Sequence, residues 1–424
     1  MSLAQSLKTK ASELGFCQTG IVKVSEAISH DRYLSWLKAG LAGEMSYLSR
    51  HAPLKKHPSS LLPTAISMLV CTWNYNTELS EASWEVPQGR ISRYAQGRDY
   101  HNIIRERLDT LGNWVATQVA KPLDWHPFVD AAPVLEREFA ARAGLGWIGK
   151  HTNLIHWKHG SWLFISGLLL SIPLDYDLPE PAGPTRKPGL QNQTPNKNTK
   201  HPPAELLYKD WPIPTLNLKE SCGSCTACIN ACPTQAITAP RVVDGRRCIS
   251  YLTIEKKTVI PREFRVSIGD WLFGCDICQE VCPWNRKAPQ PGINADLGDG
   301  AGGALNLLDV LRLDDLRFGQ RFRDTPLFRT KRRGLLRNAA IVLGNLLRAI
   351  PAEASSTYRE QGLNSLEKAL HDPEPLIRGA AAWALGEAGG VEAARWLSEK
   401  LQEEEHPEVR EELTAALTQV HIHS

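Results

Sequence analysis

Hydrophobic residues recur at regular spacing through the first 178 residues of the chain. An apolar residue at every third or fourth position predicts an amphipathic helix over 3–14. Apolar runs rich in β-branched and aromatic residues predict strands over 17–24, 66–75 and 161–171. Two longer helical stripes are predicted over 99–120 and 134–145. Helices that alternate with strands predict an α+β fold, with an α/β-type arrangement, for this part of the chain.

Two breaks in composition divide the rest of the chain. Residues 179–205 are rich in Pro, Asn, Gln and Lys with little to bury, which predicts a linker or surface insertion. A cysteine-rich segment covers 206–290, and a glycine-rich stretch over 291–304 then precedes a helical tail, 304–424. The sequence therefore predicts three domains and one linker.

The tail contains internal similarity. Asp372-Pro373 and His406-Pro407 each precede an arginine and a stripe of Ala and Leu, and "RRGLLRNAAIVLGNLL" from Arg332 looks like an earlier copy. The pattern resembles HEAT-like repeats, all-α units whose stacked helices more often form binding surfaces than catalytic sites.

The composition is that of a soluble globular protein, with 42% hydrophobic and 22% charged residues. No apolar run is long enough to cross a bilayer, and the N-terminus lacks the apolar block of a secretory signal. We therefore expect a cytoplasmic protein with reduced thiols and no membrane span. The net charge of +3 means that a polyanionic partner would have to meet a local basic patch.

Seven of the ten cysteines lie in two short motifs, "CGSCTACINACP" and "CDICQEVCP". The first motif has the C-x2-C-x2-C-x3-C-P spacing of two-cluster ferredoxins, in which the fourth cysteine binds the other cluster. Cluster one is therefore assigned to Cys222, Cys225, Cys228 and Cys282. Cluster two receives Cys232, Cys275 and Cys278 with Cys248, the one other cysteine of the segment.

The alternative for these eight cysteines is a pair of zinc sites, but their order and the two C-P endings favour two [4Fe-4S] clusters in a ferredoxin-like module. Cys17 and Cys71 lie in apolar, strand-like stretches and are predicted to be core residues. No G-x-G-x-x-G follows a strand and no D-x-H-x-x-G is present, so neither a Rossmann nicotinamide site nor a histidine on cobalt is indicated.

Longer motifs extend this interpretation. The stretch "FVDAAPVLEREFAARAGLGWIGKHTNLI", with "RYAQGRDYHNIIRERL", the ferredoxin run, "RCISYLTIE" and "RGAAAWALGEAG", closely resembles the epoxyqueuosine reductase family along essentially the whole chain. The resemblance implies a cytoplasmic enzyme, related to reductive dehalogenases, in which 1–178 binds cobalamin. It implies removal of the epoxide oxygen from the modified wobble base of tRNAs with GUN anticodons, those for Asp, Asn, His and Tyr. The insertion at 179–205 is longer than the connection typical of the family.

The resemblance assigns Asp130 as the catalytic acid. Converting an epoxide to an alkene takes two electrons and two protons, and the oxygen leaves as water. From its local context alone, Asp130 would be a turn or helix-capping aspartate. A carboxylic acid that donates a proton at neutral pH needs a raised pKa, so we expect a site made apolar by the corrin face.

The resemblance also implies a set of cobalamin contacts without a protein histidine on cobalt. Taken alone, His151 would be a surface or hydrogen-bonded histidine, and Lys56 a solvated charge. The implied contacts are Lys56, Ser92, Tyr94, Asp130, His151, Ser161 and Ser250.

A basic run extends from Arg317 to Arg337, with eight Lys and Arg residues and one acid, Asp324. Such a run can be an ordinary solvated face, but before a repeat tail it indicates contacts with tRNA phosphates. The expected contacts are Arg329, Lys331, Arg332, Arg333 and Arg337. The modified base itself is expected to be everted into a pocket above the corrin.

Two other functions compete with this interpretation. One is a reductive dehalogenase-like cobalamin enzyme for a small molecule, although the chain has no twin-arginine signal. The other is an electron-transfer or scaffold subunit, which bound cobalamin would exclude. The enzyme hypothesis further implies a monomer that receives electrons from an external donor such as a flavodoxin or ferredoxin.

Overall fold

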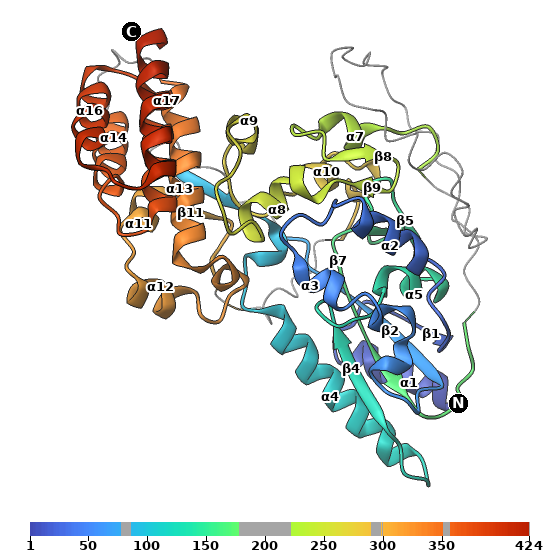
Figure 1. The fold of residues 1–424 in the computed structure, drawn as a ribbon. Helices are drawn as coiled ribbons and strands as arrows, with labels where there is room; N and C mark the ends of the chain where they lie inside the picture. Colours follow the sequence, from blue (N-terminus) through green and yellow to red (C-terminus); the bar gives the residue numbers. More distant parts are fainter. Residues whose placement is uncertain (78–85, 178–221, 290–297, 299, 351–356, 424) are drawn as a thin grey trace. The chain divides into compact units, whose positions relative to one another are not determined.

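The computed structural model describes residues 1–77, 86–177, 222–289, 298, 300–350 and 357–423 (Figure 1). The predicted linker at 179–205 and the segment 206–221 lie outside the described residues. The chain divides into two compact units. Unit 1 comprises Met1–Thr77, Tyr100–Arg246 and Asp276–Leu297, and unit 2 comprises Glu78–Asp99, Arg247–Cys275 and Gly298–Ser424.

Unit 1 combines a four-stranded sheet with helices. Its helices are α1 (Leu3–Glu13), α2 (His30–Lys38), α3 (Ser46–Arg50), α4 (Tyr100–Gln118), α5 (Glu136–Arg142), α7 (Ala227–Ala231) and α10 (Ile277–Glu280). Its strands are β1 (Gln18–Lys23), β2 (Ser67–Asn74), β4 (Trp125–Val129), β5 (Trp147–Ile148), β6 (Leu154–Ile155), β7 (Leu163–Leu170), β8 (Ile237–Ala239) and β9 (Val242–Val243). Each helix and strand predicted before residue 172 is therefore present, with shorter ends.

The main sheet has the strand order β1-β2-β7-β4, and every neighbouring pair is antiparallel. The α+β class is therefore correct, but the α/β-type arrangement, which implies parallel strands, is wrong for this sheet. Alternation of helices and strands along the sequence does not fix strand direction, because a connection that contains a helix can also return antiparallel. The antiparallel order brings the carboxyl end of β4 beside the central strand β7.

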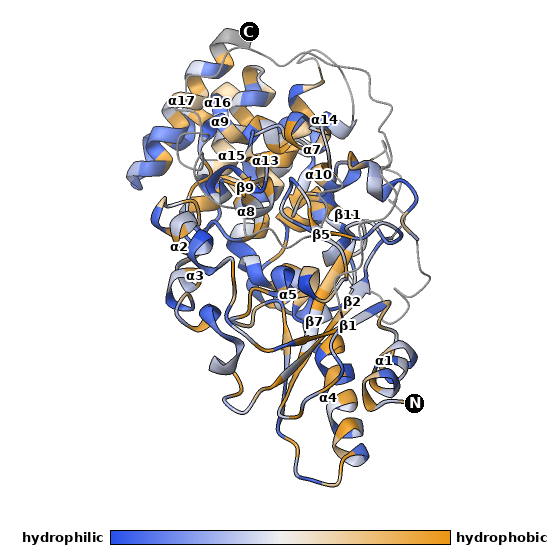
Figure 2. Cartoon of the chain, turned by 90° about the vertical axis from the view of Figure 1, so that its right-hand side faces the viewer, coloured by the Kyte–Doolittle hydropathy of each residue, from blue (hydrophilic) through white to orange (hydrophobic). Residues whose placement is uncertain are grey.

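The core of unit 1 follows the predicted apolar pattern. All eight residues of β2 are buried, and orange, hydrophobic segments run along the sheet in Figure 2. On α4, the predicted stripe buries Ile104, Leu108, Leu111 and Val115. This helix packs against β4 and β7, so its first turn lies close to the loop that follows β4. Cys71 is buried and Cys17 is half-buried, as the sequence predicts for core cysteines.

Unit 2 contains a small sheet and the helical tail. Its strands are β3 (Gln88–Ile91), β10 (Trp271–Phe273) and β11 (Ala304–Asn306). Its helices are α8 (Ile249–Ile254), α9 (Arg262–Arg265), α11 (Leu307–Leu311), α12 (Asp315–Phe322), α13 (Lys331–Arg348), α14 (Thr357–Ala369), α15 (Pro375–Ala388), α16 (Val391–Glu403) and α17 (Pro407–His423). The three predicted repeat helices are thus α13, α15 and α17.

The compact units cut across the contiguous domain boundaries predicted from the sequence. Strand β3 comes from the predicted N-terminal domain, yet it pairs with β10 in parallel and with β11 in antiparallel orientation. These pairs join three segments that are far apart in the sequence, which no composition boundary could indicate.

The repeat helices pack through small residues. Helix α15 contacts both α13 and α17. A Cβ added at Gly344 of α13 would lie 2.7 Å from the Cβ of Ala384, and one added at Gly386 would lie 2.9 Å from Ala416. The stripe of Gly and Ala therefore allows the close helix approach on which a stacked repeat depends.

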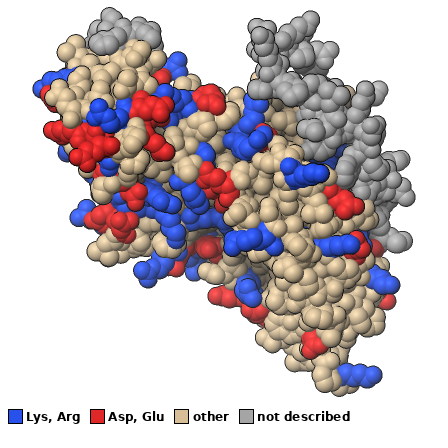
Figure 3. Space-filling view, in the orientation of Figure 1, with Lys and Arg blue, Asp and Glu red and all other residues tan. Residues whose placement is uncertain are grey.

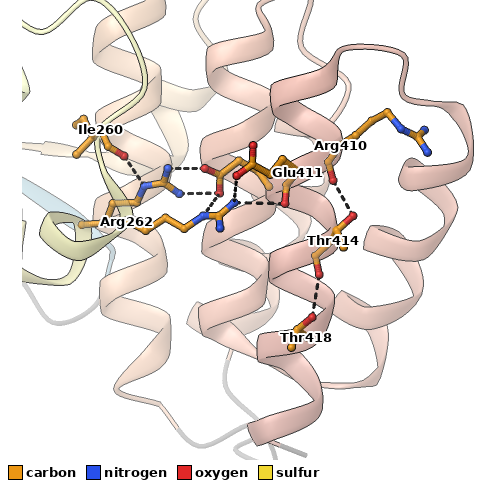
Figure 4. A network of polar contacts seen from close by, with 8 residues as sticks. Ile260, Arg262, Arg410, Glu411, Thr414 and Thr418 are labelled. Carbon is orange, nitrogen blue, oxygen red and sulfur yellow. Dashed lines mark hydrogen bonds and ion pairs between the residues drawn. The ribbon is translucent and has the colours of Figure 1, made fainter.

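A buried ion pair links α17 to α9 within unit 2 (Figure 4). The Arg265 guanidinium, whose side chain is 2% exposed, donates to both carboxylate oxygens of Glu412 at 2.9 and 2.6 Å. It also donates to the Ile260 carbonyl at 2.8 Å. Arg262 donates to Glu412 at 3.1 Å and lies 3.9 Å from Glu411, which is 77% exposed.

Replacing Glu412 with glutamine is expected to destabilise unit 2 by about 3 kcal/mol, because it leaves the buried Arg265 charge without its partner. The matched control is Glu411→Gln, which removes an exposed charge and should cost less than about 0.5 kcal/mol. Urea unfolding followed by circular dichroism measures both variants. Equal midpoints for the two variants would contradict the importance of the buried pair.

Candidate functional site

Four cysteines of unit 1 gather at the site predicted for cluster one. Cys228 lies on α7, and Cys282 follows α10, which packs against α7. Both thiols are buried, and Cys282 shares an apolar cluster with Cys222. Burial, with a smaller contribution from Cys222 and Cys225, raises the pKa of Cys228 to about 11 and that of Cys282 to about 12. Buried thiols this close to one another become thiolates once iron replaces their protons.

Four thiols are the donors that a [4Fe-4S] cluster takes from a protein. Cys222, Cys225 and Cys228 come from one loop with the C-x2-C-x2-C spacing, and Cys282 comes from a distant part of the chain. Among the described residues, no group of three or more His, Cys, Asp or Glu side chains has the arrangement of a single-ion site. The donor set fits a [4Fe-4S] cluster.

The cysteines predicted for cluster two are divided between the units. In unit 1, Cys232 follows α7 and its sulfur accepts a hydrogen bond from the Ala236 amide at 3.2 Å, and Cys278 lies on α10. In unit 2, Cys248 precedes α8 and Cys275 follows β10, and these two elements pack together. Each unit thus brings two of the four assigned ligands onto elements that contact each other.

A lysine that the sequence analysis did not single out lies against the loop of cluster one. The Lys150 ammonium donates to the carbonyls of Gly223 and Cys225 at 2.7 and 2.9 Å. The Arg241 amide donates to the Lys150 carbonyl at 2.9 Å. The turn between β5 and β6 therefore carries a positive charge to the cysteine loop, where it would offset the negative charge of thiolates that bind a cluster.

Asp130 stands directly after β4 in a strained conformation, with φ +37°. The Tyr100 hydroxyl, from the first turn of α4, donates to Asp130 Oδ2 at 2.5 Å. His101 Nε2 lies 3.4 Å from the same oxygen. These two neighbours hold the Asp130 carboxyl group in place. The side chain is 54% exposed, so the carboxyl group stays open to a substrate.

A cavity of about 350 Å³ lies beside this loop in unit 1. It is lined by Leu61, His101, Asn102, Arg105, His126, Pro127, Phe128, Val129, Ala131, Ala132 and Pro133. His101 both lines this cavity and lies next to the Asp130 carboxyl group. His101 therefore connects the Asp130 carboxyl group with this cavity.

The structure brings Lys55, and not Lys56, to the Asp130 loop. Lys56 is exposed, and its ammonium lies 3.3 Å from Glu26 Oε1. Lys55 is buried and donates to the Val134 carbonyl at 3.1 Å and to the Ala132 carbonyl at 3.5 Å. Adjacent lysines of equal charge look alike in a sequence, so only the backbone path separates them.

The remaining residues implied to contact cobalamin are also divided between the units. In unit 1, the buried Ser161 hydroxyl accepts hydrogen bonds from Gln279 at 3.0 Å and Asn285 at 2.9 Å. In unit 2, Ser92 is buried, Tyr94 packs against Phe273 and Ser250 lies on α8.

His151 offers an unsatisfied polar atom in unit 1. The ring is 4% exposed, and burial lowers its pKa to about 4, so the imidazole is neutral. Its Nδ1 accepts a hydrogen bond from the Asn153 amide at 3.2 Å, which leaves the proton on Nε2. Nε2 is buried without a partner among the described residues. A buried donor of this kind fits a polar group of a bound cofactor such as a corrin amide.

Two of the five predicted phosphate contacts are wrong, because their guanidinium groups are buried. Arg337 is 1% exposed and donates to the carbonyls of Leu252, Lys256 and Thr258. Arg332 is 9% exposed and pairs with Asp372. Both have structural roles within unit 2.

The other three predicted phosphate contacts are exposed. They are Arg329, which pairs with Glu255 at 2.7 Å, Lys331, which lies over the Phe328 ring, and Arg333. Arg317, Arg321 and Arg323, on or next to α12, are exposed too. In Figure 3, blue side chains gather in the region that α12 occupies in Figure 1. The patch that remains available to an anion is thus formed by α12 and the start of α13.

The double set of cysteines, the loop with an acid and the helical repeats define an iron–sulfur oxidoreductase with a repeat domain. Family models agree with this class: "4Fe-4S double cluster binding domain" matches 221–285, "Epoxyqueuosine reductase QueG" matches 55–131 and "HEAT repeats" matches 329–418. The part of the chain that the structure describes has no helix long and apolar enough to span a membrane.

Curated relatives and solved structures agree on one family. The chain is 36% identical over 399 residues to the epoxyqueuosine reductase of Xanthomonas campestris, covering 91% of this chain and 96% of the relative. It is 34% identical over 397 residues to that of Escherichia coli, covering 91% and 89%. The chain belongs to the epoxyqueuosine reductase family.

Two solved structures are similar over 99% of both chains at 25% identity. One is an epoxyqueuosine reductase with a tRNA-Tyr epoxyqueuosine-modified stem loop, with a TM-score of 0.80. The other is the Bacillus subtilis enzyme with its catalytic loop swung out of the active site, with a TM-score of 0.78.

Proposed function

We propose that this chain reduces epoxyqueuosine to queuosine at the wobble position of tRNAs with GUN anticodons. The observation that carries the proposal is the match, along nine-tenths of the chain, to epoxyqueuosine reductases. The solved relative with a modified tRNA stem loop supports the choice of substrate. The cysteine sets support the redox class of the reaction.

The reaction takes two electrons and two protons, breaks both C–O bonds of the epoxide, forms a C=C bond and releases water. When bound, two [4Fe-4S] clusters and cobalamin supply one-electron transfer and a low-valent cobalt for the substrate carbon. The cysteine sets of both units hold the clusters. Lys56, Ser92, Tyr94, Asp130, His151, Ser161 and Ser250 remain the proposed contacts of the corrin.

Asp130 supplies a proton to the departing oxygen. Asp130 stands in the strained turn after β4 with its side chain partly exposed, and the Tyr100 hydroxyl fixes the orientation of the carboxyl group through Oδ2. His101 lies 3.4 Å from the same oxygen and also lines the cavity, so it is placed to return a proton to Asp130. In the Bacillus subtilis relative the catalytic loop occurs swung out of the active site, which supports a movable loop around Asp130.

The tRNA is held mainly through its phosphates. The exposed Arg329, Lys331 and Arg333 at the start of α13 are the proposed contacts, together with the arginines near α12. The modified base is everted toward Asp130. The enzyme acts as a cytoplasmic monomer and receives electrons from a small external carrier such as a flavodoxin or ferredoxin.

The test is an anaerobic single turnover of the reduced protein, loaded with iron and cobalamin, on tRNA carrying epoxyqueuosine. We expect mass spectrometry of the released nucleosides to show the loss of one oxygen, and this loss should depend on added cobalamin. No product from protein that contains both clusters and bound corrin would contradict the proposal and favour a small-molecule substrate, as in reductive dehalogenases. Failure to bind cobalamin would favour an electron-transfer subunit.

A further inference from the structure

A buried ammonium group faces the backbone of the Asp130 loop. Lys55 is 9% exposed and lies at the centre of the short 3-10 helix Leu54–Lys56. Its Nζ donates to the carbonyls of Val134 and Ala132 at 3.1 and 3.5 Å. Burying an ammonium group costs free energy unless its N–H groups find acceptors. The buried position of Lys55 is therefore stable only while the loop keeps these two carbonyls in place.

Charged residues in and next to the Asp130 loop also interact with Lys55. Burial lowers the pKa of the Lys55 ammonium, Glu136 and Asp130 raise it, and Arg137 lowers it. Nζ also lies 5.8 Å from the centre of the Tyr33 ring. The lysine thus contacts the Asp130 loop through both backbone acceptors and charge.

The loop itself is fixed at its two ends and strained between them. Val129 ends β4, and Val134 is 1% exposed in the core that also contacts Ala132. Asp130, with its positive φ, stands between these anchors. A non-glycine residue keeps such a conformation only when its surroundings hold it there. The two hydrogen bonds from Lys55 fall on the half of the loop that follows Asp130.

We propose that Lys55 is a positioning residue that holds the Asp130 loop in its catalytic conformation. Lys55 touches neither the acid's carboxyl oxygens nor a reacting atom, and it acts through the backbone of Ala132 and Val134. This inference rests on the proposed role of Asp130. Its first test uses no substrate, so it can fail independently of the proposed function.

The test compares hydrogen exchange in wild type, Lys55→Met and Lys55→Gln, read by mass spectrometry on peptides that cover 128–136. Methionine keeps the chain length without donors or charge, and exchange of the loop amides should become about tenfold faster. Glutamine keeps two N–H donors and should give an intermediate rate. Lys38→Met, which removes an exposed charge at the end of α2, is the matched control and should leave the loop unchanged.

Two results would overturn the proposal at this stage. One is equal loop exchange in wild type and Lys55→Met. The other is faster exchange spread evenly over β2 and β7, which would give Lys55 a general structural role. If Lys55→Met does not fold, the comparison of Lys55→Gln with wild type decides between the same outcomes.

Single-turnover kinetics then connect the loop to the reaction. For Lys55→Met we expect the rate at saturating tRNA to fall about tenfold while the tRNA concentration for half-maximal rate stays unchanged. Iron and corrin contents should match wild type. Unchanged turnover despite faster loop exchange would overturn the positioning role. Wild-type turnover in Asp130→Asn would remove the proposed acid and leave the exchange result standing.

Discussion

Asp130→Asn is expected to slow single turnover by at least about 100-fold, because asparagine has no acidic proton to give to the epoxide oxygen. The exchange keeps the size of the side chain and the acceptor for the Tyr100 hydroxyl, which now donates at 2.5 Å. The iron and corrin contents should therefore stay at wild-type levels. Quenched anaerobic reactions with mass spectrometry of the nucleosides measure the rate.

The matched control for this prediction is Asp124→Asn. Asp124 is exposed in the same unit and accepts a hydrogen bond from the Thr64 hydroxyl at 3.0 Å, so its loss should leave turnover unchanged. Wild-type turnover in Asp130→Asn would remove Asp130 from the mechanism. Loss of bound corrin together with turnover would explain the slower reaction by loss of the cofactor, and the result would then no longer support Asp130 as the acid.

The sequence predicted the elements around this acid because their apolar patterns are long and regular. On α4 the buried residues recur with the helical period because one face of the helix is buried. In β2 the run of buried residues is continuous because both faces of the strand are buried. Strand direction was not predictable in this way, since an apolar strand pattern looks the same in parallel and antiparallel sheets. The sequence did not predict the discontinuous compact units, because β3 (Gln88–Ile91) pairs with strands as distant as Trp271–Phe273 and Ala304–Asn306.

Charged residues show the limit of sequence reasoning most clearly. Lys55 and Lys56 are adjacent, yet one is buried against the Asp130 loop and the other pairs with Glu26 at the surface. In α13, Arg332 and Arg337 are buried, while Arg333 is exposed. A run of basic residues predicts a patch, but partners from distant segments, Asp372 for Arg332 and backbone carbonyls for Arg337, decide which of its members are buried.

Cysteine spacing is informative because a cubane restricts where its ligands can lie. Cys282 is assigned to cluster one because the fourth cysteine of such a motif binds the other cluster in two-cluster ferredoxins. In the structure, Cys282 packs together with Cys222 among apolar residues. Lys150, beside the loop that carries Cys222 and Cys225, could not be found from a sequence motif, because its hydrogen bonds go to backbone carbonyls, which every residue has. The assignment of Cys248 to cluster two stays a prediction, because Cys248 and Cys232 lie in different units.

Cys282→Ala is expected to remove cluster one and so to leave the anaerobically reconstituted protein with about half its iron. The three remaining thiols of that site come from one short loop, and alanine leaves the fourth iron without a protein ligand. Substrate reduction should fall below detection, since the electron carriers act in series. Iron analysis and the electron paramagnetic resonance spectrum of the reduced protein measure the loss.

The control for this variant is Cys17→Ala. Cys17 is half-buried in unit 1 and its thiol contacts the Thr72 carbonyl at 3.2 Å, so both clusters should persist without it. Cys232 is assigned to cluster two, so Cys232→Ala should lose as much iron as Cys282→Ala. The cluster that remains is a different one in each variant, so their electron paramagnetic resonance spectra should differ. Identical residual spectra in the two variants would place both cysteines on one cluster and contradict the ferredoxin-like exchange of ligands.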